Sequence, residues 1–133
     1  MADLIASAKL NHLSFPSNDV PATVKFFEQQ LGCTVLSQGR SAILKRPGFD
    51  IVITDASTHP VAWHDDFHFG IEMPTREAVE ALYARFKAEG VEMKTEVFKH
   101  ERGSRFFCVE PGGIVCEVNT RSDAEDAYRE TFK

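Results

Sequence analysis

Apolar and polar positions along the chain fall into short alternating stretches and two longer stretches with helical spacing. In the first half, apolar residues recur every three or four positions ahead of Gly32: they are Val20, Val24, Phe27 and Leu31. This spacing predicts a helix that ends at the glycine. One strand is predicted before the helix, over Leu10–Phe15, and three are predicted after it: Cys33–Leu36, Ala42–Leu44 and Phe49–Thr54.

The second half repeats this order. Phe67–Met73 alternates between apolar and polar residues, which predicts a strand with one buried face. Thr75 can cap a following helix that ends at Gly90, and the apolar stripe of this helix is Val79, Leu82, Tyr83 and Phe86. Three more strands are predicted after it: Val91–Phe98, Arg105–Glu110 and Ile114–Asn119. The last two flank Pro-Gly-Gly at 111–113, whose proline and two glycines favour a tight hairpin turn, both glycines at positive φ.

The repeated order predicts a single domain, residues 1–133, built from two tandem β-α-β-β-β modules. The modules span residues 8–55 and 66–119, and residues 120–133 form a C-terminal extension, an amphipathic helix or a partly ordered segment. The fold class is therefore α+β, with the two modules forming a curved mixed sheet around a concave face. Each helix is expected to cover one face of its sheet and to leave the other face open.

The open face carries the residues that could bind a metal or take part in a reaction. Side chains alternate along a strand, so Glu117 shares a face with Val115 and Asn119, and His68 shares one with Asp66, Gly70 and Glu72. His12 lies with Leu10 and Ser14 on the corresponding face of the first module. A carboxylate in a strand as apolar as that of Glu117 requires a cation. Two imidazoles and one carboxylate form a facial triad that can hold a divalent ion, and the alternative is a solvated face with a Glu–His ion pair and no metal.

Composition narrows the class of protein. Of the 133 residues, 43% are hydrophobic and 26% are charged, which is ordinary for a globular domain. The formal charge of −5 and the lack of a Lys/Arg cluster argue against nucleic-acid binding. No apolar run approaches the roughly 18 residues of a membrane span, and no secretory signal is recognisable. The odd number of cysteines predicts reduced, buried thiols, so we expect a cytoplasmic protein that does not bind membranes.

Three segments give the chain a resemblance to a known family: LNHLSF at 10–15, DFHFGIEM at 66–73 and EPGGIVCEV at 110–118. Together with the tandem layout, they resemble the vicinal oxygen chelate superfamily over nearly the whole chain, about residues 10–119. That superfamily includes glyoxalase I, extradiol dioxygenases, fosfomycin-resistance thiol transferases, epimerases and bleomycin-binding proteins. The resemblance implies a divalent metal ion (Fe, Mn, Zn or Ni) held by His12, His68 and Glu117, and a small substrate that chelates it through oxygen atoms.

Local departures separate the subfamilies. Glyoxalase I-like enzymes have a fourth ligand, a carboxylate, where this chain has Val52, and bleomycin-binding relatives lack the ligands altogether. The extradiol signature is the closest local match, with these residues in register: His100, Phe106, Glu110, Pro111, Gly113 and Glu117. Phe98 departs from its start, and Phe107 stands where both this signature and the fosfomycin-resistance enzymes have tyrosine. The match implies that His100 lies beside the metal as an acid/base group or hydrogen-bond partner.

The sequence therefore predicts a metal-dependent enzyme that resembles an extradiol dioxygenase in its local motif. The alternatives are a thiol transferase of the fosfomycin-resistance type, an isomerase or lyase of the same superfamily, and a non-catalytic protein that binds or sequesters a small molecule. Residues expected to contact the substrate are Ser14, Glu72, Arg105, Phe107 and Asn119. The family resemblance also implies a homodimer that can exchange modules, with His12 contributed by the same chain or by the partner.

Overall fold

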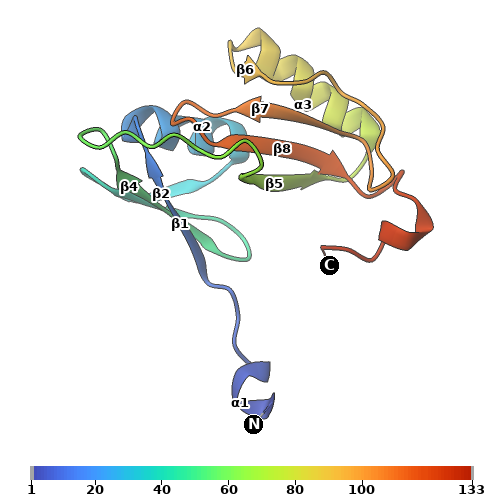
Figure 1. Cartoon of the computed structure of the whole chain (residues 1–133), viewed down its shortest axis with the longest axis horizontal. Helices are drawn as coiled ribbons and strands as arrows, with labels where there is room; N and C mark the ends of the chain where they lie inside the picture. The colour runs from blue at the N-terminus through green and yellow to red at the C-terminus, as the bar shows by residue number, and fades with distance from the viewer. Residues whose placement is uncertain (1, 133) are drawn as a thin grey trace. The chain divides into compact units, whose positions relative to one another are not determined.

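The computed structural model describes residues 2–132 and consists of two compact units, Met1–Val61 and Ala62–Lys133. Each unit holds one four-stranded mixed sheet and one long helix (Figure 1). The strand orders are β1-β4-β3-β2 and β5-β8-β7-β6, so the two sheets have the same topology. The predicted α+β fold of two β-α-β-β-β modules is confirmed, with the strands forming two separate sheets.

The first unit follows the predicted order of elements. Its helices and strands are α1 (Ala2–Ala6), β1 (His12–Ser17), α2 (Val20–Leu31), β2 (Thr34–Gln38), β3 (Ala42–Lys45) and β4 (Asp50–Asp55). Asp19 caps α2 by accepting a hydrogen bond from the Ala22 backbone, and Gly32 ends the helix with φ of 67°, as its place after the apolar stripe predicts. Phe27 of α2 packs on Phe15 of β1, with ring centroids 5.8 Å apart. This contact anchors the helix to one face of the sheet.

The second unit contains β5 (His68–Met73), α3 (Arg76–Ala88), β6 (Glu92–Met93), β7 (Arg105–Val109) and β8 (Val115–Thr120), followed by the short 3-10 helix η1 (Asp126–Tyr128). Thr75 caps α3 through the Ala78 backbone. The helix lies across β7 and β8 (Figure 1), where Phe86 and Tyr83 pack edge-on against the fully buried Phe106. Because side chains alternate along β7, Phe107 points to the opposite, open face of the sheet.

The backbone pairing confirms the internal repeat. In each unit the first strand runs parallel to the last, and the paired residues at corresponding positions are Ser14 with Val52 and Gly70 with Glu117. Gly48 and Gly113, which precede the last strands, both have positive φ, 96° and 103°. Val52 is therefore the counterpart of Glu117. The first unit has no carboxylate at the place where the second unit has one.

The β7–β8 hairpin lies where it was predicted, and a buried side chain also stabilises its turn. Of the two glycines in its turn, only Gly113 has positive φ, so the expectation that both would is wrong. Glu110 is 2% exposed, and its carboxylate accepts hydrogen bonds from the backbone N–H groups of Gly112 and Ile114, at 2.8 and 3.1 Å. The turn is thus held by a buried side chain as well as by its proline and glycines.

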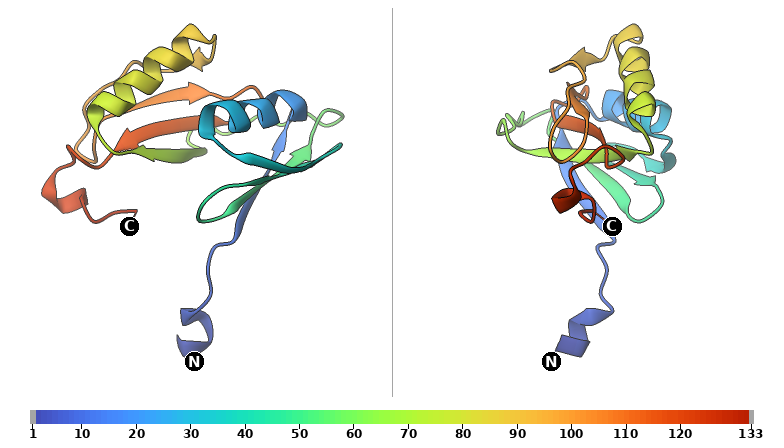
Figure 2. Two further views of the ribbon diagram at one scale, coloured as in Figure 1. Left: turned by 180° about the vertical axis from the view of Figure 1, so that it is seen from behind. Right: turned by 90° about the vertical axis from the view of Figure 1, so that its right-hand side faces the viewer.

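Three segments differ from the expected elements. The strand predicted over Val91–Phe98 is limited to Glu92–Met93 and one isolated bridge from Phe98 to Arg105. In the predicted C-terminal extension, Thr120 belongs to β8, and the rest of its described part forms only η1, because its apolar residues are too few to hold a longer helix against the sheet. At the other end, α1 lies away from the sheet of its own unit (Figure 2), with Leu4 and Ile5 more than two-thirds exposed.

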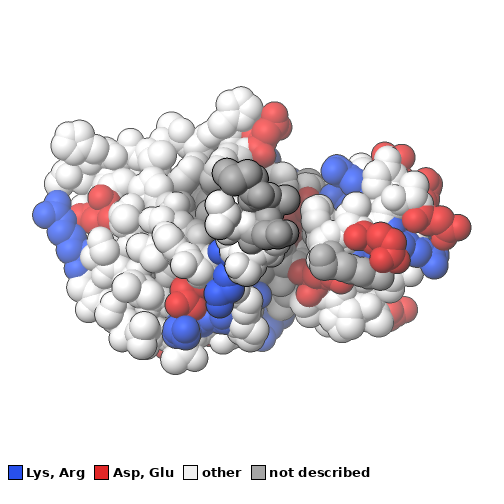
Figure 3. All heavy atoms as spheres, turned by 90° about the horizontal axis from the view of Figure 1, so that it is seen from below, with Lys and Arg blue, Asp and Glu red and all other residues white. Residues whose placement is uncertain are grey.

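The face of the molecule seen from below carries charges of both signs (Figure 3). On the face drawn in Figure 3, acidic and basic side chains are interspersed among larger uncharged areas. Over residues 2–132, no helix has both the length and the apolar character needed to span a bilayer. The three cysteines, Cys33, Cys108 and Cys116, are all buried, and none of them forms a disulfide bond.

Candidate functional site

Glu117 lies at the centre of the open face of the second sheet. It belongs to the buried strand β8, is 6% exposed, and stands between Gly70 of β5 and Phe107 of β7. Its Oε1 atom accepts a hydrogen bond from Nη1 of Arg105 at 3.1 Å, and its Oε2 atom accepts one from the Asn119 amide. The cation that the apolar strand requires is therefore present within the chain, in the form of a buried guanidinium.

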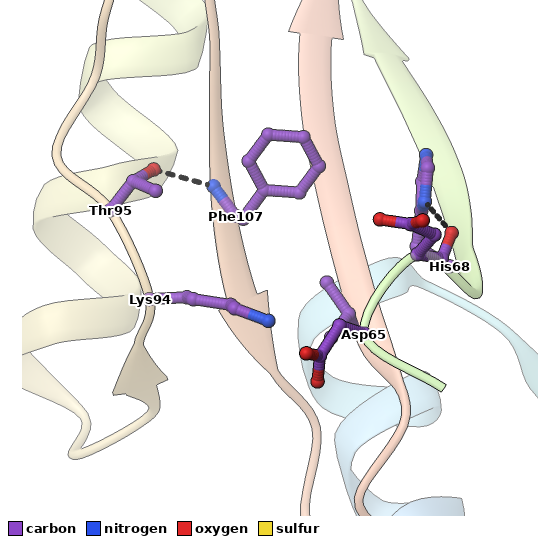
Figure 4. Close-up of a pocket in the computed structure, with 7 residues that line it drawn as sticks. Asp65, His68, Lys94, Thr95 and Phe107 are labelled. Carbon is purple, nitrogen blue, oxygen red and sulfur yellow. Dashed lines mark hydrogen bonds between the residues drawn. The ribbon is translucent and has the colours of Figure 1, made fainter. Parts of the chain in front are cut away.

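His68 faces the same carboxylate from the first residue of β5. Its Nδ1 atom is 2.9 Å from the backbone oxygen of Asp66, and a carbonyl can only accept, so Nδ1 carries the hydrogen (Figure 4). In the neutral imidazole, Nε2 then presents a lone pair, and it lies 3.5 Å from Oε1 of Glu117. Two acceptors that face one another repel, so this arrangement needs a proton or a cation between them.

A divalent ion fits between these two atoms. Ligand atoms bound to one ion at about 2.1 Å and at angles of 90–110° lie roughly 3–3.4 Å apart, close to the separation observed. A carboxylate has about four acceptor positions. Arg105 and Asn119 occupy one on each oxygen of Glu117, which leaves one on each for a metal. The backbone carbonyl that orients Nδ1 of His68 is the kind of partner that metal-binding imidazoles use.

The third predicted ligand belongs to the other unit. His12 is exposed at the start of β1, and its Nδ1 atom donates to the Asn11 side-chain oxygen at 2.6 Å, which leaves Nε2 as a free acceptor. Over residues 2–132, no three His, Cys, Asp or Glu side chains gather into a metal site. The structure thus brings His68 and Glu117 together, and the participation of His12 stays a prediction.

A pocket of about 760 Å³ opens beside His68. Figure 4 shows Lys94 extending into it near Asp65, and Phe107 directing its ring across β8. The Phe107 ring meets His68 edge-on, with centroids 5.7 Å apart. The lining residues are Asp65, Asp66, His68, Lys94, Thr95, Phe107 and Val115. The pocket therefore combines an apolar wall with charged groups, as small-molecule sites commonly do.

The other predicted site residues are placed differently. Asn119 bonds to Glu117, and Arg105 also does so, so both support the carboxylate rather than line the pocket. Glu72 is exposed on β5 and Ser14 is exposed on β1 of the first unit. His100 does not line the pocket: its Nδ1 accepts from the Arg102 backbone, and its ring packs against Phe98. Phe98 in turn stacks on Phe107 at 6.2 Å.

Lys94 and Thr95 are pocket residues that strand alternation could not identify. The backbone N–H groups of both donate to the same acceptor, the carbonyl oxygen of Phe107, and the Thr95 hydroxyl accepts from the Phe107 N–H. This doubled contact ends the regular pairing of β6 and shifts the register. The polar and charged residues at 94–96 were the available signal, but they do not distinguish a pocket wall from a solvated strand.

The electrostatics of the site depend on Arg105, which is 3% exposed. Burial lowers the pKa of its guanidinium from the usual value, and the attraction of Glu117 opposes that change. Arginine nevertheless keeps its charge in proteins. Nε donates to the Gly103 carbonyl at 3.1 Å, which fixes the plane of the guanidinium beside Glu117. In the second unit, the negative charge of the Glu117 carboxylate is therefore already balanced by Arg105.

Comparison with known families agrees with the fold. Residues 9–118 match the family model of the Glyoxalase/Bleomycin resistance protein/Dioxygenase superfamily. The chain belongs to this superfamily. The resemblance inferred from the three sequence segments is thereby confirmed. No curated protein matches the sequence.

Solved structures of the superfamily share the fold at low identity. A possible glyoxalase from Bacillus cereus has a TM-score of 0.74 and 24% identity, covering 86% of this chain and 99% of its own. The fosfomycin resistance protein FosX from Listeria monocytogenes has a TM-score of 0.76 and 18% identity, with coverages of 92% and 98%. A lactoylglutathione lyase from Agrobacterium tumefaciens has a TM-score of 0.69 and 14% identity, covering 86% of this chain and 95% of its own. At these identities the likeness extends to the fold, because the superfamily fold supports many reactions.

Proposed function

We propose that the protein is a divalent-metal-dependent enzyme of the vicinal oxygen chelate type, acting on a small substrate that chelates the ion through neighbouring oxygen atoms. The observation that carries the proposal is the 3.5 Å approach of His68 Nε2 to Glu117 Oε1, with the histidine oriented so that both atoms are acceptors. His68, Glu117 and His12 would hold the ion. When bound, it would supply Lewis-acid polarisation of the substrate oxygens.

The chain's own residues would bind and orient the substrate. Phe107 and Val115 provide an apolar wall for its carbon skeleton, and the Lys94 ammonium can attract an anionic substituent. Arg105 and Asn119 hold the Glu117 carboxylate in one orientation. The Asp66 carbonyl fixes the tautomer of His68, so that the ring presents the same nitrogen to the site in every molecule.

On the local sequence motif, ring-cleaving dioxygenase chemistry is proposed first and thiol transfer or isomerisation next, although His100 of that motif does not line the pocket. A metal-free binding protein is the second candidate, and one observation favours it: Glu117 already accepts hydrogen bonds on both oxygens, one of them from a buried cation. A protonated His68 would then satisfy the remaining contact without a metal. The proposed enzyme requires a bound divalent ion, and the binding protein does not.

Metal stoichiometry is the deciding measurement. Metal-free protein titrated with Fe(II), Mn(II), Zn(II), Ni(II) or Co(II) is expected to bind about one ion per chain, detected by elemental analysis after gel filtration. Failure of all five ions to bind stoichiometrically would leave the binding-protein function standing. For the loaded protein, oxygen uptake with catechols indicates a dioxygenase, and loss of thiol in the presence of an epoxide indicates a transferase.

The role of His12 can be tested together with the proposed homodimer. If each site takes His12 from one chain and His68 with Glu117 from another, His12→Ala and His68→Ala should each bind no metal alone. Refolding the two variants together should then restore one complete site in each mixed dimer. No recovery in a mixed dimer would mean that His12 serves its own chain. Metal binding by His12→Ala alone would remove His12 from the ligand set.

A further inference from the structure

We infer that Arg105 sets the charge of the site, so that the metal-loaded protein selects a doubly negative chelating substrate over a singly negative one of the same geometry. The inference rests on the proposed function and specifies its substrate class. It starts from the buried ion pair between Nη1 of Arg105 and Oε1 of Glu117, 3.1 Å apart. Arg105 acts on the substrate through this charge and through Glu117, so it is a positioning residue.

Charge counting gives the direction of the effect. Two neutral imidazoles and one carboxylate around a divalent ion give a net charge of +1. The Arg105 guanidinium raises the total to +2, because its side chain is only 4% exposed and its charge is little screened by solvent. The acidic residues at the pocket entrance weigh less, since the Asp66 side chain is 95% exposed and solvated. Arg121, which is 7% exposed, adds further positive potential at Arg105, and Lys94 lines the pocket. A dianionic chelator therefore offsets more of the positive charge of the site than a monoanion does.

The guanidinium also keeps a hydrogen-bonding capacity that the protein does not use. Nη1 donates to Glu117 and Nε donates to the Gly103 carbonyl, but Nη2 is buried and has no hydrogen-bond partner within the described residues. Oδ1 of Asn119, the residue paired with Arg105 across β7 and β8, is also buried and without a partner there. Buried polar atoms are rarely left unsatisfied, so each of these two atoms keeps an unused hydrogen-bonding capacity beside Glu117.

A purely structural ion pair would not explain this arrangement. Replacing a buried ion pair by apolar residues is often neutral or stabilising, so stability alone does not require one in this strand pair. The same charge that stabilises Glu117 also opposes a metal ion at that carboxylate. Arg105 is therefore expected to weaken metal binding and to strengthen the binding of a dianion, two effects that a structural role would not link.

The test uses the full chain loaded with Co(II) and two probes that chelate through neighbouring oxygens, oxalate as the dianion and glycolate as the monoanion. Arg105→Gln is expected to bind Co(II) at least tenfold more tightly than the wild type. Its affinity for oxalate should fall roughly tenfold more than its affinity for glycolate, since the lost charge acts twice on the dianion. Calorimetry and the visible absorption of the bound cobalt measure these dissociation constants without any turnover.

One further variant controls for misfolding and for lost contacts. Arg105→Lys keeps the charge without the planar fork and should retain the oxalate-to-glycolate ratio of the wild type within about threefold. An unchanged ratio in folded Arg105→Gln overturns the inference. Failure of the wild type to bind Co(II) or any of the other four ions, measured before any chelator is added, overturns the proposed function as well.

Discussion

The His68→Ala variant is expected to lose stoichiometric binding of a divalent ion while keeping its fold. Among the described residues of the second unit, His68 supplies the imidazole that faces Glu117, and its Nδ1 contact to Asp66 serves to orient the ring. Removing a residue that hydrogen-bonds to a metal ligand typically lowers metal affinity about 10–100-fold, and removing the ligand itself should lower the affinity by more than that. Competition with a coloured chelator measures the affinity, and circular dichroism checks the fold.

A matched control is available in the first unit. His59 is exposed in the loop after β4, where its contact is the Thr58 hydroxyl at 3.3 Å. The His59→Ala variant also removes one imidazole from the chain, and it should bind the ion as the wild type does. Equal affinity of His68→Ala and wild type would show that the ion, if it binds, does so elsewhere, and the proposed site would have to be abandoned.

The mutation should also change the metal-free protein in a definite way. His68 is 40% exposed at its side chain, and its ring contacts Phe107 edge-on in the wall of the pocket. An exposed residue of this kind contributes little to the free energy of unfolding. We therefore expect the stability of metal-free His68→Ala to lie within about 1 kcal/mol of the wild type. A large loss of metal affinity with a small loss of stability is characteristic of a ligand.

Strand alternation predicted the placement of the site residues well. It placed His68 and Glu117 on the open face, where the structure brings them within 3.5 Å of one another. Phe107, which the family motif singled out, lies on the same face, opposite the buried Phe106. The repeat further identified Val52 as the counterpart of Glu117, which the pairing of Ser14 with Val52 bears out. These features depend on local periodicity and on turns with glycine at positive φ, both of which are visible in the sequence.

The partners of the site residues were less predictable. Glu117 in an apolar strand indicated a nearby cation, and the sequence interpretation supplied a metal ion. The structure supplies Arg105, two residues before Phe107 on the neighbouring strand. Side chains two residues apart on one strand share a face, so the diagonal contact could have been found from the hairpin register. Lys94 could not, because it depends on the doubled backbone contact to Phe107 that interrupts β6.

The reaction type depends on features that the fold does not determine. His100 matches the extradiol signature in sequence, yet in the structure it contacts Phe98 and the Arg102 backbone rather than the pocket. A one-dimensional motif records the spacing of residues and not the direction of a loop. Chemistry in this superfamily must therefore be assigned from the groups of the site itself, which here include Lys94 and Phe107 in the pocket wall and the Arg105–Glu117 pair next to His68.

The Glu110→Ala variant is expected to destabilise the protein by about 3–5 kcal/mol, because two hydrogen bonds to a buried charged group are lost. Glu110 is 2% exposed, and its two oxygens accept from the backbone of Gly112 and Ile114. Glu110→Gln keeps the shape of the side chain, but its amide group directs hydrogens at one of these N–H groups. This variant should lose about 2–3 kcal/mol, the energy of one such bond and an unsatisfied donor. Urea denaturation measures both values.

Glu92→Gln is the control, since Glu92 is an exposed residue of β6 and its neutralisation should change stability by less than about 0.5 kcal/mol. Stability of Glu110→Gln equal to that of this control would show that Pro111 and Gly113 hold the turn alone. The distinction matters for the site, because the turn sets the register of β7 against β8. A one-residue slip would turn Glu117 towards the helix and Cys116 towards the pocket. The buried Glu110 carboxylate thus keeps the Glu117 carboxylate on the open face.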